Sequence, residues 1–323
     1  MTTTDIITED RRMREIIQLA KTVASSKATV MIQGESGTGK ELVACLIHEH
    51  STRAARPFVA INCAAIPENL LESELFGYER GAFTGAVTSK AGKFEFANGG
   101  TILLDEISEM DVRLQAKLLR VIQESEVDRI GGRKPIPVDV RIIATSNRNL
   151  TECVKEGSFR EDLFYRLNVV NLTLPPLRER LGDVKILARD FLVKMASKSG
   201  KNIQDFSVDA MNILEAHVWH GNIRELENVI ERAALTAQGP LVLPQDIAIE
   251  RRITAPSEAA DELSMLDRNW SPGQTLDQIE KNVILEALKY HKGNRTHTAK
   301  ALGISIRTLR NKLADYRMTG IHV

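Results

Sequence analysis

The chain of 323 residues has no hydrophobic run long enough to cross a lipid bilayer, which takes roughly 20 consecutive apolar residues. Residues 1–10 are polar and acidic, and they lack the apolar core of a secretory signal. Cysteine is scarce, since only Cys45, Cys63 and Cys153 occur, far apart and without metal-ligand spacing. We therefore expect a cytoplasmic protein without membrane contact, whose cysteines are small buried hydrophobic residues.

An excess of charge of one sign is also lacking, because 43 basic residues balance 43 acidic ones. The balance is not local. Residues 289–317 contain eight Lys or Arg and one Asp, which gives this segment a charge of +7 and leaves −7 on the rest. A small basic module on an acidic body predicts a local contact with a polyanion.

Apolar runs with β propensity alternate with amphipathic helix patterns through the first half of the chain. This order predicts an α/β fold, a parallel sheet covered by helices on both faces. We expect strands at residues 29–33, 58–62, 101–104, 141–146 and 169–174. We expect helices at residues 11–25, 41–50, 69–76 and 112–125.

The pattern changes after Pro175-Pro176, and helical periodicity alone continues from residue 183 to about residue 237. Periodicity then weakens around an Ala-Pro-Ser and a Ser-Pro-Gly turn, which is typical of a linker. The predicted domains are an α/β subdomain at 1–177, a helical subdomain at 178–249, a linker at 250–273 and a C-terminal domain at 274–323.

A glycine-rich segment follows the first expected strand and precedes a helix. Its glycines let successive N–H groups point at one spot, the helix start adds partial positive charge, and Lys40 reaches the outer phosphates of a nucleotide. This P-loop pattern usually ends in a Ser or Thr whose hydroxyl binds Mg²⁺, but here Glu41 takes that position. We therefore expect the metal to depend more on water and on a second acid. The segment is Gly34-Glu35-Ser36-Gly37-Thr38-Gly39-Lys40-Glu41.

The second acid follows the expected strand at 101–104, which leads into Asp105-Glu106. Parallel strands deliver the residues at their carboxyl ends to the edge where the P-loop lies. We expect Asp105 to hold Mg²⁺, directly or through water, and Glu106 to polarise the water that attacks ATP.

Residues 34–226 resemble the central domain of bacterial enhancer-binding proteins, the AAA+ activators of sigma-54 RNA polymerase. Five motifs in the family's order carry the resemblance: NCAAIPENLLESELF, GYERGAFTGA, FREDLFYRLNV, LPPLRER and GNIRELEN. The resemblance implies an AAA+ P-loop parallel sheet with a helical lid, ATP and Mg²⁺ as cofactors, and the sigma-54 RNA polymerase holoenzyme as partner.

The GAFTGA motif is the most specific of these. The resemblance implies that it is the sigma-54 contact, with Phe83 and Thr84 touching the factor and the glycines acting as hinges. From the residues alone, a tight turn with Phe83 tucked inward is the stronger interpretation. The loop is Gly81-Ala82-Phe83-Thr84-Gly85-Ala86.

The resemblance also implies roles in the nucleotide cycle. Asn62 looks like the residue that holds Glu106 back until the γ-phosphate is sensed. Asn147 matches the polar sensor after the fourth strand, although residues 144–147 are Ala-Thr-Ser-Asn where Ala-Ala-Thr-Asn is commoner. Arg224 matches the lid arginine that reaches the nucleotide.

Arg160 and Arg166 match the two candidate arginine fingers, and the sequence does not decide between them. The fixed fork of donors in arginine suits charge on a transferring phosphoryl group. A finger supplied by a neighbour requires head-to-tail contacts, which close into a ring. The resemblance implies a homo-oligomeric ring, a hexamer.

Near the C-terminus an amphipathic helix at 276–290 is followed by helix patterns at 296–302 and 305–316, joined by Gly303-Ile304. This is the geometry of a helix-turn-helix, and residues 292–313 resemble the Fis-type DNA-binding module. The predicted core is Ala299, Leu302, Ile304, Ile306, Leu309 and Leu313. The predicted DNA contacts are Arg307, Thr308, Arg310, Asn311 and Lys312.

Which of these five residues touch bases stays open at this point; Arg307 and Arg310 are the leading candidates for base edges. The short stretch before residue 29 leaves no room for a receiver domain of ~100 residues. Either a separate regulatory protein or control of expression governs the chain, or the chain is part of a longer regulator.

The sequence thus favours a sigma-54-dependent transcriptional activator that binds upstream enhancer DNA and hydrolyses ATP to remodel the holoenzyme. The alternative is a DNA-binding regulator whose ATPase domain only oligomerises. The complete set of Lys40, Asp105, Glu106, two arginines and an unbroken GAFTGA favours the first. A chaperone-like remodeller is disfavoured by the DNA-binding module.

Overall fold

The computed structural model describes residues 5–180, 182–249, 275–291 and 293–318. The chain divides into two compact units, Met1–Ile249 and Glu250–Val323. The predicted linker at 250–273 lies outside the described residues. Within the described ranges, no helix is long and apolar enough to cross a membrane.

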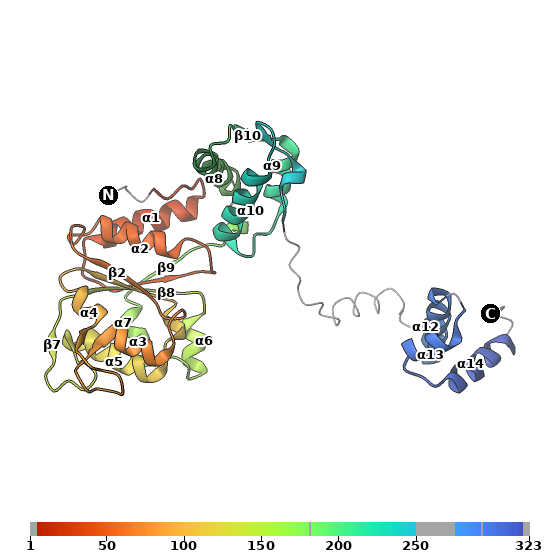
Figure 1. Ribbon diagram of the computed structural model, residues 1–323, viewed down its shortest axis with the longest axis horizontal. Helices are drawn as coiled ribbons and strands as arrows, with labels where there is room; N and C mark the ends of the chain where they lie inside the picture. Colours follow the sequence, from red (N-terminus) through yellow and green to blue (C-terminus); the bar gives the residue numbers. More distant parts are fainter. Residues whose placement is uncertain (1–4, 181, 250–274, 292, 319–323) are drawn as a thin grey trace. The chain divides into compact units, whose positions relative to one another are not determined.

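The first unit is built on a five-stranded parallel sheet in the order β2-β5-β8-β1-β9 (Figure 1). Its central strands are apolar and buried, because helices cover both faces of the sheet. All five predicted strands are confirmed, with ends that differ by at most one residue. They are β1 (Val30–Gln33), β2 (Phe58–Asn62), β5 (Thr101–Asp105), β8 (Arg141–Ser146) and β9 (Val170–Thr173).

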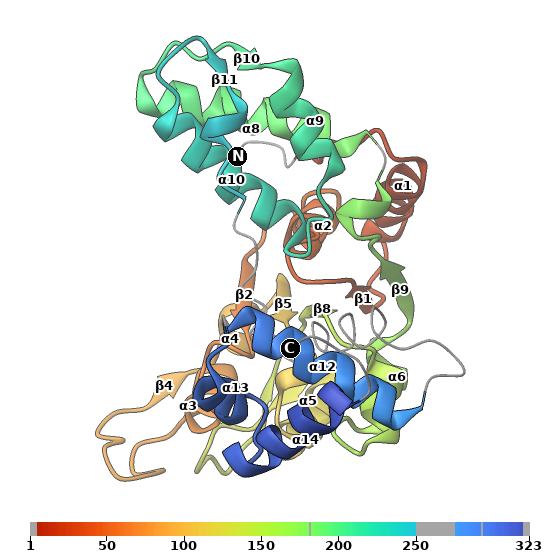
Figure 2. The ribbon, with the colours of Figure 1, turned by 90° about the vertical axis from the view of Figure 1, so that its right-hand side faces the viewer.

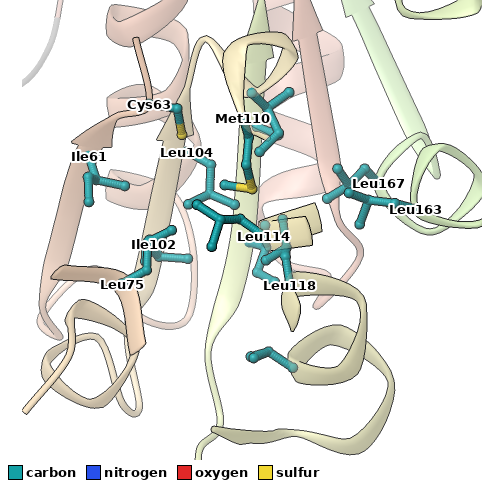
Figure 3. Close-up of a cluster of buried hydrophobic side chains, with 14 of the residues drawn as sticks. Ile61, Cys63, Leu75, Ile102, Leu104, Met110, Leu114, Leu118, Leu163 and Leu167 are labelled. Carbon is teal, nitrogen blue, oxygen red and sulfur yellow. The ribbon is translucent and has the colours of Figure 1, made fainter. Parts of the chain in front are cut away.

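Helices α1 (Arg11–Ala24) and α2 (Lys40–Glu49) cover one face of the sheet. The other face carries the larger hydrophobic cluster, in which Leu104 of β5 lies close to Met110 and Leu114 (Figure 3). The helices on this side are α3 (Glu68–Phe76), α4 (Lys93–Phe96), α5 (Val112–Glu124), α6 (Leu150–Lys155) and α7 (Glu161–Leu167).

Two short antiparallel pairs project from this layer, and the sequence did not predict them. They are β3 (Gly77–Tyr78) with β4 (Lys90–Ala91), and β6 (Glu126–Val127) with β7 (Ile136–Pro137). The β3–β4 connection extends away from the sheet (Figure 2). Strands of two residues are too short to show alternating hydrophobicity, so periodicity could not reveal them.

The helical part of this unit has its own hydrophobic core, around Leu192, Trp219 and Leu226. It contains η2 (Leu177–Glu179), α8 (Asp183–Ser199), α9 (Val208–Ala216), α10 (Asn222–Thr236) and η3 (Pro244–Asp246). A short parallel pair, β10 (Asp205–Phe206) with β11 (Leu241–Val242), corrects the expectation that helices alone form this part. The domain boundary at 177/178 stays a prediction.

The second unit contains α12 (Leu276–Tyr290), α13 (Arg295–Ala301) and α14 (Ile306–Met318). Four residues form its buried core: Ile284, Ala299, Leu309 and Leu313. The core prediction was wrong for Ile306, whose side chain is 39% exposed. Ile306 is the first residue of α14, so it lies at the end of the helix face that continues with the buried Leu309 and Leu313.

The cysteines are free, and Cys63 and Cys153 are buried as predicted, whereas Cys45 is only partly buried. Burial, followed by the negative charges of Asp105 and Glu106, raises the pKa of the Cys63 thiol to about 12. Cys63 is therefore a protonated packing residue at neutral pH, which matches its expected role as a small hydrophobic side chain.

Candidate nucleotide site and contact surfaces

The turn from β1 into α2 forms the predicted P-loop. Gly39 precedes the helix in the left-handed conformation, at φ 96°, which only glycine adopts freely. The ammonium of Lys40 is buried and donates to the carbonyl oxygens of Gly34 at 2.9 Å and of Glu35 at 3.3 Å. The Thr38 hydroxyl donates to the Glu35 carbonyl at 2.8 Å. The loop is thus braced from within by its own side chains.

A cavity of about 290 Å³ opens in front of this loop. Its lining comes from the P-loop, from the end of β5 and from α10: Ser36, Gly37, Gly39, Lys40, Glu41, Leu42, Asp105, Glu106, Ile223, Arg224 and Glu227. The predicted phosphate-binding lysine, the two predicted acids and the predicted lid arginine therefore line one cavity.

The acids lie at the carboxyl end of β5. Glu106 makes an ion pair with Lys40, at 3.2 Å between Oε1 and Nζ, and accepts the Asn147 N–H at 2.9 Å. Asp105 accepts hydrogen bonds at both carboxylate oxygens, from Asn62 Nδ2 at 2.7 Å and from the Thr145 hydroxyl at 2.6 Å. Both carboxylates are therefore held in place beside the phosphate-binding loop.

The position of Asn62 differs from the expected contact. Its amide donates to Asp105 and not to Glu106, because β2 and β5 are paired in a register that sets Asn62 opposite Asp105. Its carbonyl oxygen accepts the N–H groups of Ala64 and Ala65, each at 2.9 Å, so the side chain also closes the turn after β2. Asn147 meets Glu106 through its backbone N–H.

These acids suit Mg²⁺. Mg²⁺ keeps several waters and takes one or two carboxylates together with phosphate oxygens. Among the described residues there is no group of three or more His, Cys, Asp or Glu that could hold a metal ion alone. Asp105 lies beside a phosphate-binding loop, which suits an Mg²⁺ ion bound by a protein carboxylate and nucleotide phosphates together. The exposed Glu41 lines the same cavity.

The start of α10 lies directly on the P-loop. Its residues donate to three P-loop groups: the Ile223 N–H to the Gly37 carbonyl at 2.9 Å, Arg224 to the Ser36 hydroxyl at 3.0 Å, and the Asn222 amide to the Ser36 carbonyl at 3.0 Å. Asn222 is fully buried, and it also accepts the Leu177 N–H at 2.7 Å. The helical part therefore meets the phosphate-binding loop through a set of direct hydrogen bonds.

Glu35 makes a charged contact across this interface. Its carboxylate accepts two hydrogen bonds from the guanidinium of Arg178, at 2.8 and 2.6 Å, and one from the Asn222 amide at 3.1 Å. The bond from Arg178 is the main cause that lowers the pKa of Glu35 to about 2. Nearby, Arg180 is buried and donates to the Thr38 carbonyl at 3.0 Å.

The two candidate arginine fingers lie at the two ends of α7. Arg160 precedes the helix and binds the carboxylate of Asp162 at 3.0 and 2.7 Å, and this bond raises the pKa of the guanidinium. Arg166 is in the last turn and is exposed. Neither arginine is among the described residues that line the cavity around Lys40.

The predicted sigma-54 loop is a turn closed by backbone hydrogen bonds, from the Gly81 N–H to Ala86 O at 2.8 Å and from the Ala86 N–H to Phe83 O at 3.0 Å. Phe83 is 46% exposed, and its ring meets that of Tyr78 in an edge-to-face arrangement with 5.0 Å between centroids. Thr84 is exposed. Phe83 is thus not tucked inward.

The base of this loop is tied to the β6–β7 connection. The guanidinium of Arg129 binds Glu79 at 2.9 Å and Glu95 at 2.7 Å, and the Glu79 N–H donates to Ile130 O at 2.9 Å. The turn that carries Phe83 therefore has a fixed base and an exposed tip.

In the second unit, four of the five predicted DNA contacts are exposed: Arg307, Thr308, Arg310 and Asn311. Lys312 differs, because its ammonium makes an ion pair with Glu280 of α12 at 2.7 Å. Ser305 caps the start of α14, since its hydroxyl accepts the Thr308 N–H at 3.0 Å. Gly303 has φ 66°, the left-handed conformation that the turn before α14 requires.

Comparison with protein families assigns three parts of the chain. Residues 6–173 match the sigma-54 interaction domain. Residues 178–263 match the AAA+ ATPase lid domain, and residues 275–316 match the bacterial regulatory protein family of Fis. The chain belongs to the family of sigma-54-dependent transcriptional activators.

Relatives over nearly the whole chain agree. The transcriptional regulatory protein FlbD of Caulobacter vibrioides is 52% identical over 332 residues, which cover 98% of this chain and 71% of FlbD. The regulatory protein AtoC of Escherichia coli is 52% identical over 314 residues, 96% of this chain and 67% of AtoC. Crystal structures of NtrX from Brucella abortus, in complex with ATP and with ADP, both have a TM-score of 0.72 at 35% and 34% identity.

The NtrX structures cover 96% and 98% of this chain and 69% of the NtrX chain. The predicted fold of this sigma-54-dependent activator is thereby confirmed: an AAA+ P-loop sheet, a helical lid and a C-terminal helix-turn-helix.

Sequence reasoning missed several residues of the site in this activator. Arg178 and Arg180 lie in the LPPLRER motif and Asn222 in GNIRELEN, so the resemblance marks their segments but not their contacts. Thr145 stands out in the sequence only as a departure from the commoner Ala-Ala-Thr-Asn. Each acts through a hydrogen bond that depends on how distant segments pack, which no single segment reveals.

Proposed function

We propose that this chain binds upstream enhancer DNA and uses ATP hydrolysis to remodel the sigma-54 RNA polymerase holoenzyme so that the promoter opens. The observation that carries the proposal is the cavity where Lys40 lies beside Glu106 and Asp105, with Arg224 of α10 in the same lining. Binding of ATP and ADP by the related NtrX adds support.

In this proposal the P-loop N–H groups and Lys40 hold the phosphates of ATP. Mg²⁺, held by Asp105 directly or through water, supplies positive charge to the outer phosphates when bound. Lys40 makes an ion pair with Glu106 at 3.2 Å, and a triphosphate competes for the same ammonium. The freed Glu106 then accepts a proton from the attacking water.

The predicted residues around the acids are parts of the proposal, and the role of Asn62 is revised. Asn62 orients the carboxylate of Asp105, on which its amide lies at 2.7 Å, instead of holding Glu106 directly. Asn147 senses the state of Glu106 through the N–H that donates to it. Arg224 reaches the phosphates from α10, whose start already binds the P-loop.

The proposed assembly is a homo-oligomeric ring, a hexamer, in which a neighbour supplies the arginine finger. Arg160 and Arg166 lie at opposite ends of α7. In their own chain, neither is among the described residues that line the cavity around Lys40. A residue that acts in trans requires head-to-tail contacts, and such contacts close into a ring. Arg166, exposed in the last turn of α7, and Arg160, paired with Asp162, both remain candidates.

The proposed sigma-54 contact is the turn at residues 81–86. Its exposed Phe83 and Thr84 offer an aromatic surface and a hydroxyl at the tip of a connection that is fixed at its base by Arg129. The proposed DNA contact is the start and middle of α14, where Arg307 and Arg310 are exposed. A regulator with these partners acts in the bacterial cytoplasm, where the chromosome lies.

ATP hydrolysis by the purified protein is the first test, with Glu106→Gln as the decisive variant. The amide keeps the size of the side chain but accepts no proton, so we expect turnover to fall by about 10²-fold to 10⁴-fold while ATP binding persists. Glu109→Gln is the matched control, because Glu109 is an exposed acid of the same turn. Equal turnover of Glu106→Gln and wild type would instead support the regulator whose ATPase domain only oligomerises.

A further inference from the structure

Thr145 is a buried residue at the carboxyl end of β8, and none of the roles above uses it. Its side chain is fully buried, and its Oγ1 lies 2.6 Å from Asp105 Oδ1 and 3.0 Å from the Glu106 backbone nitrogen. The N–H of Glu106 donates to this oxygen. The single hydroxyl proton of Thr145 is therefore available for Asp105, which fixes the direction of both hydrogen bonds.

The first of these bonds orients the acid predicted to bind Mg²⁺. Asp105 has Thr145 as donor at one carboxylate oxygen and Asn62 as donor at the other, at 2.7 Å. Two donors on opposite oxygens set the plane of the carboxylate. Each oxygen keeps a lone pair for a metal ion or a metal-bound water.

The second bond stabilises an unusual backbone conformation. Glu106 has φ 52° and ψ 52°, a left-handed conformation that residues other than glycine seldom adopt. This turn aims the Glu106 side chain at Lys40 and at the N–H of Asn147. The Thr145 hydroxyl gives the backbone N–H of the turn a buried acceptor, which that N–H would otherwise lack.

We propose that Thr145 is a positioning residue of the nucleotide site, whose one hydroxyl fixes both the plane of the Asp105 carboxylate and the turn that aims Glu106. The inference rests on the proposed ATPase function, because it assigns Mg²⁺ to Asp105 and the attacking water to Glu106. It also gives meaning to Ala-Thr-Ser-Asn at residues 144–147, since the commoner Ala-Ala-Thr-Asn has no hydroxyl at position 145.

The test compares Thr145→Val, which removes the hydroxyl, with Thr145→Ser, which keeps it. We expect Val to raise the Mg²⁺ concentration needed for half-maximal ATP turnover by roughly 10-fold to 100-fold, the usual effect of losing a residue that orients a metal ligand. We expect Ser to restore it. ATP binding in EDTA, followed by calorimetry, should stay unchanged in both because the P-loop is intact, while the gain in affinity on adding Mg²⁺ is lost in Val alone.

Thr101→Val is the matched control. Thr101 is also a fully buried strand threonine, bound to His48 at 3.0 Å, but it lies at the opposite end of β5. This control should lower the thermal unfolding midpoint without moving the Mg²⁺ dependence. If Thr145→Val does not fold, Thr145→Ala, which introduces the family's commoner residue, replaces it.

The outcomes separate the two proposals. An active wild type with the same Mg²⁺ dependence in Thr145→Val overturns the role of Thr145 and leaves the ATPase proposal standing. A wild type that hydrolyses no ATP overturns the ATPase proposal, and the Mg²⁺-dependent gain in nucleotide affinity still decides about Thr145. Failure of Thr145→Ser to restore the wild-type values counts against the hydroxyl as the cause.

Discussion

Glu35 is a P-loop residue whose charge serves the interface with the helical lid. Its carboxylate is bound by both Arg178 and Asn222, and the bond from Arg178 lowers its pKa from 4.5 to about 2. A carboxyl group whose pKa is lower in the folded protein stabilises the fold most at high pH. The contribution of Glu35 is therefore complete above pH 4.5 and is lost as the pH falls toward about 2.

This sign predicts the behaviour of Glu35→Gln. Both side chains of the ion pair between Arg178 and Glu35 are more than a third exposed, Arg178 by 36% and Glu35 by 42%. We therefore expect a loss of at most about 1 kcal/mol in the free energy of unfolding at pH 7. Urea unfolding at a series of pH values should show this difference shrinking below pH 4.5. A difference that stays constant down to pH 3 would contradict the assignment of the charge effect.

Glu41→Gln is the control for that measurement. Glu41 is also an acid of the P-loop region, but it is exposed in the first turn of α2. Its substitution should leave the pH profile of stability nearly parallel to that of the wild type.

The contact between the P-loop and α10 depends on the absence of a side chain at Gly37. A Cβ there would lie 2.3 Å from the carbonyl oxygen of Gly221, closer than any real contact, and Gly37 has φ 78°. A larger residue must therefore push the start of α10 off the loop. The hydrogen bond from the Ile223 N–H to Gly37 O would be lost with it.

For Gly37→Ala we predict a loss of nucleotide affinity together with a fall in stability. The left-handed backbone alone costs about 1–2 kcal/mol for a residue with a Cβ, and the clash adds to this cost. Gly200→Ala is a matched control, since Gly200 has φ 66° but a Cβ added there would meet nothing within 4 Å. Both variants should lower the unfolding midpoint, whereas only Gly37→Ala should weaken ATP binding. Equal nucleotide affinity in the two would count against a close contact between loop and lid.

The elements differ in how far the sequence predicts them. The five strands and α2, α3 and α5 were predicted closely, because runs of four or more apolar or periodic residues carry a clear signal. The pairs β3–β4 and β10–β11 were missed because two residues show no period. In the nucleotide site, the P-loop pattern predicts Lys40, and the pair of acids after the strand at 101–104 predicts Asp105. The bond from Asn62 to Asp105 depends on the register between β2 and β5, which the sequence leaves open.

Helix α14 offers a comparison between two basic residues that the sequence alone does not distinguish. Arg310 is exposed, whereas Lys312 is paired with Glu280 at 2.7 Å. We expect Arg310→Ala to weaken operator binding by about 1–3 kcal/mol if it reads a base edge, or to reduce the salt slope by ~1 if it contacts a phosphate. Lys312→Ala should change DNA affinity less, because its ammonium is already engaged.

Quantitative footprinting at several salt concentrations would measure both variants. Unchanged affinity and salt slope for Arg310→Ala would reject its role in DNA binding. A larger loss for Lys312→Ala than for Arg310→Ala would mean that the pair with Glu280 opens on DNA.

At the scale of the whole molecule, the proposed activities occupy separate surfaces. The nucleotide cavity and the turn at 81–86 belong to the first compact unit, and α14 belongs to the second. Phe83 and Thr84 are exposed. Neither is among the described residues that line the cavity around Lys40. A variant of this turn should therefore affect remodelling without removing nucleotide chemistry or DNA binding.

Thr84→Ala tests this separation, because it removes one hydroxyl from the exposed tip and leaves the backbone hydrogen bonds of the turn in place. We expect transcription in vitro from a sigma-54 promoter to fall by at least about 10-fold, since a lost partner contact of ~1.4 kcal/mol has that effect. ATP turnover and footprinting should stay at wild-type values. Thr88→Ala, an exposed threonine of the same β3–β4 connection, is the control. Full activation by Thr84→Ala would mean that this hydroxyl does not make the sigma-54 contact. A parallel loss of ATP turnover would mean that the turn and the nucleotide cavity do not work as separate surfaces.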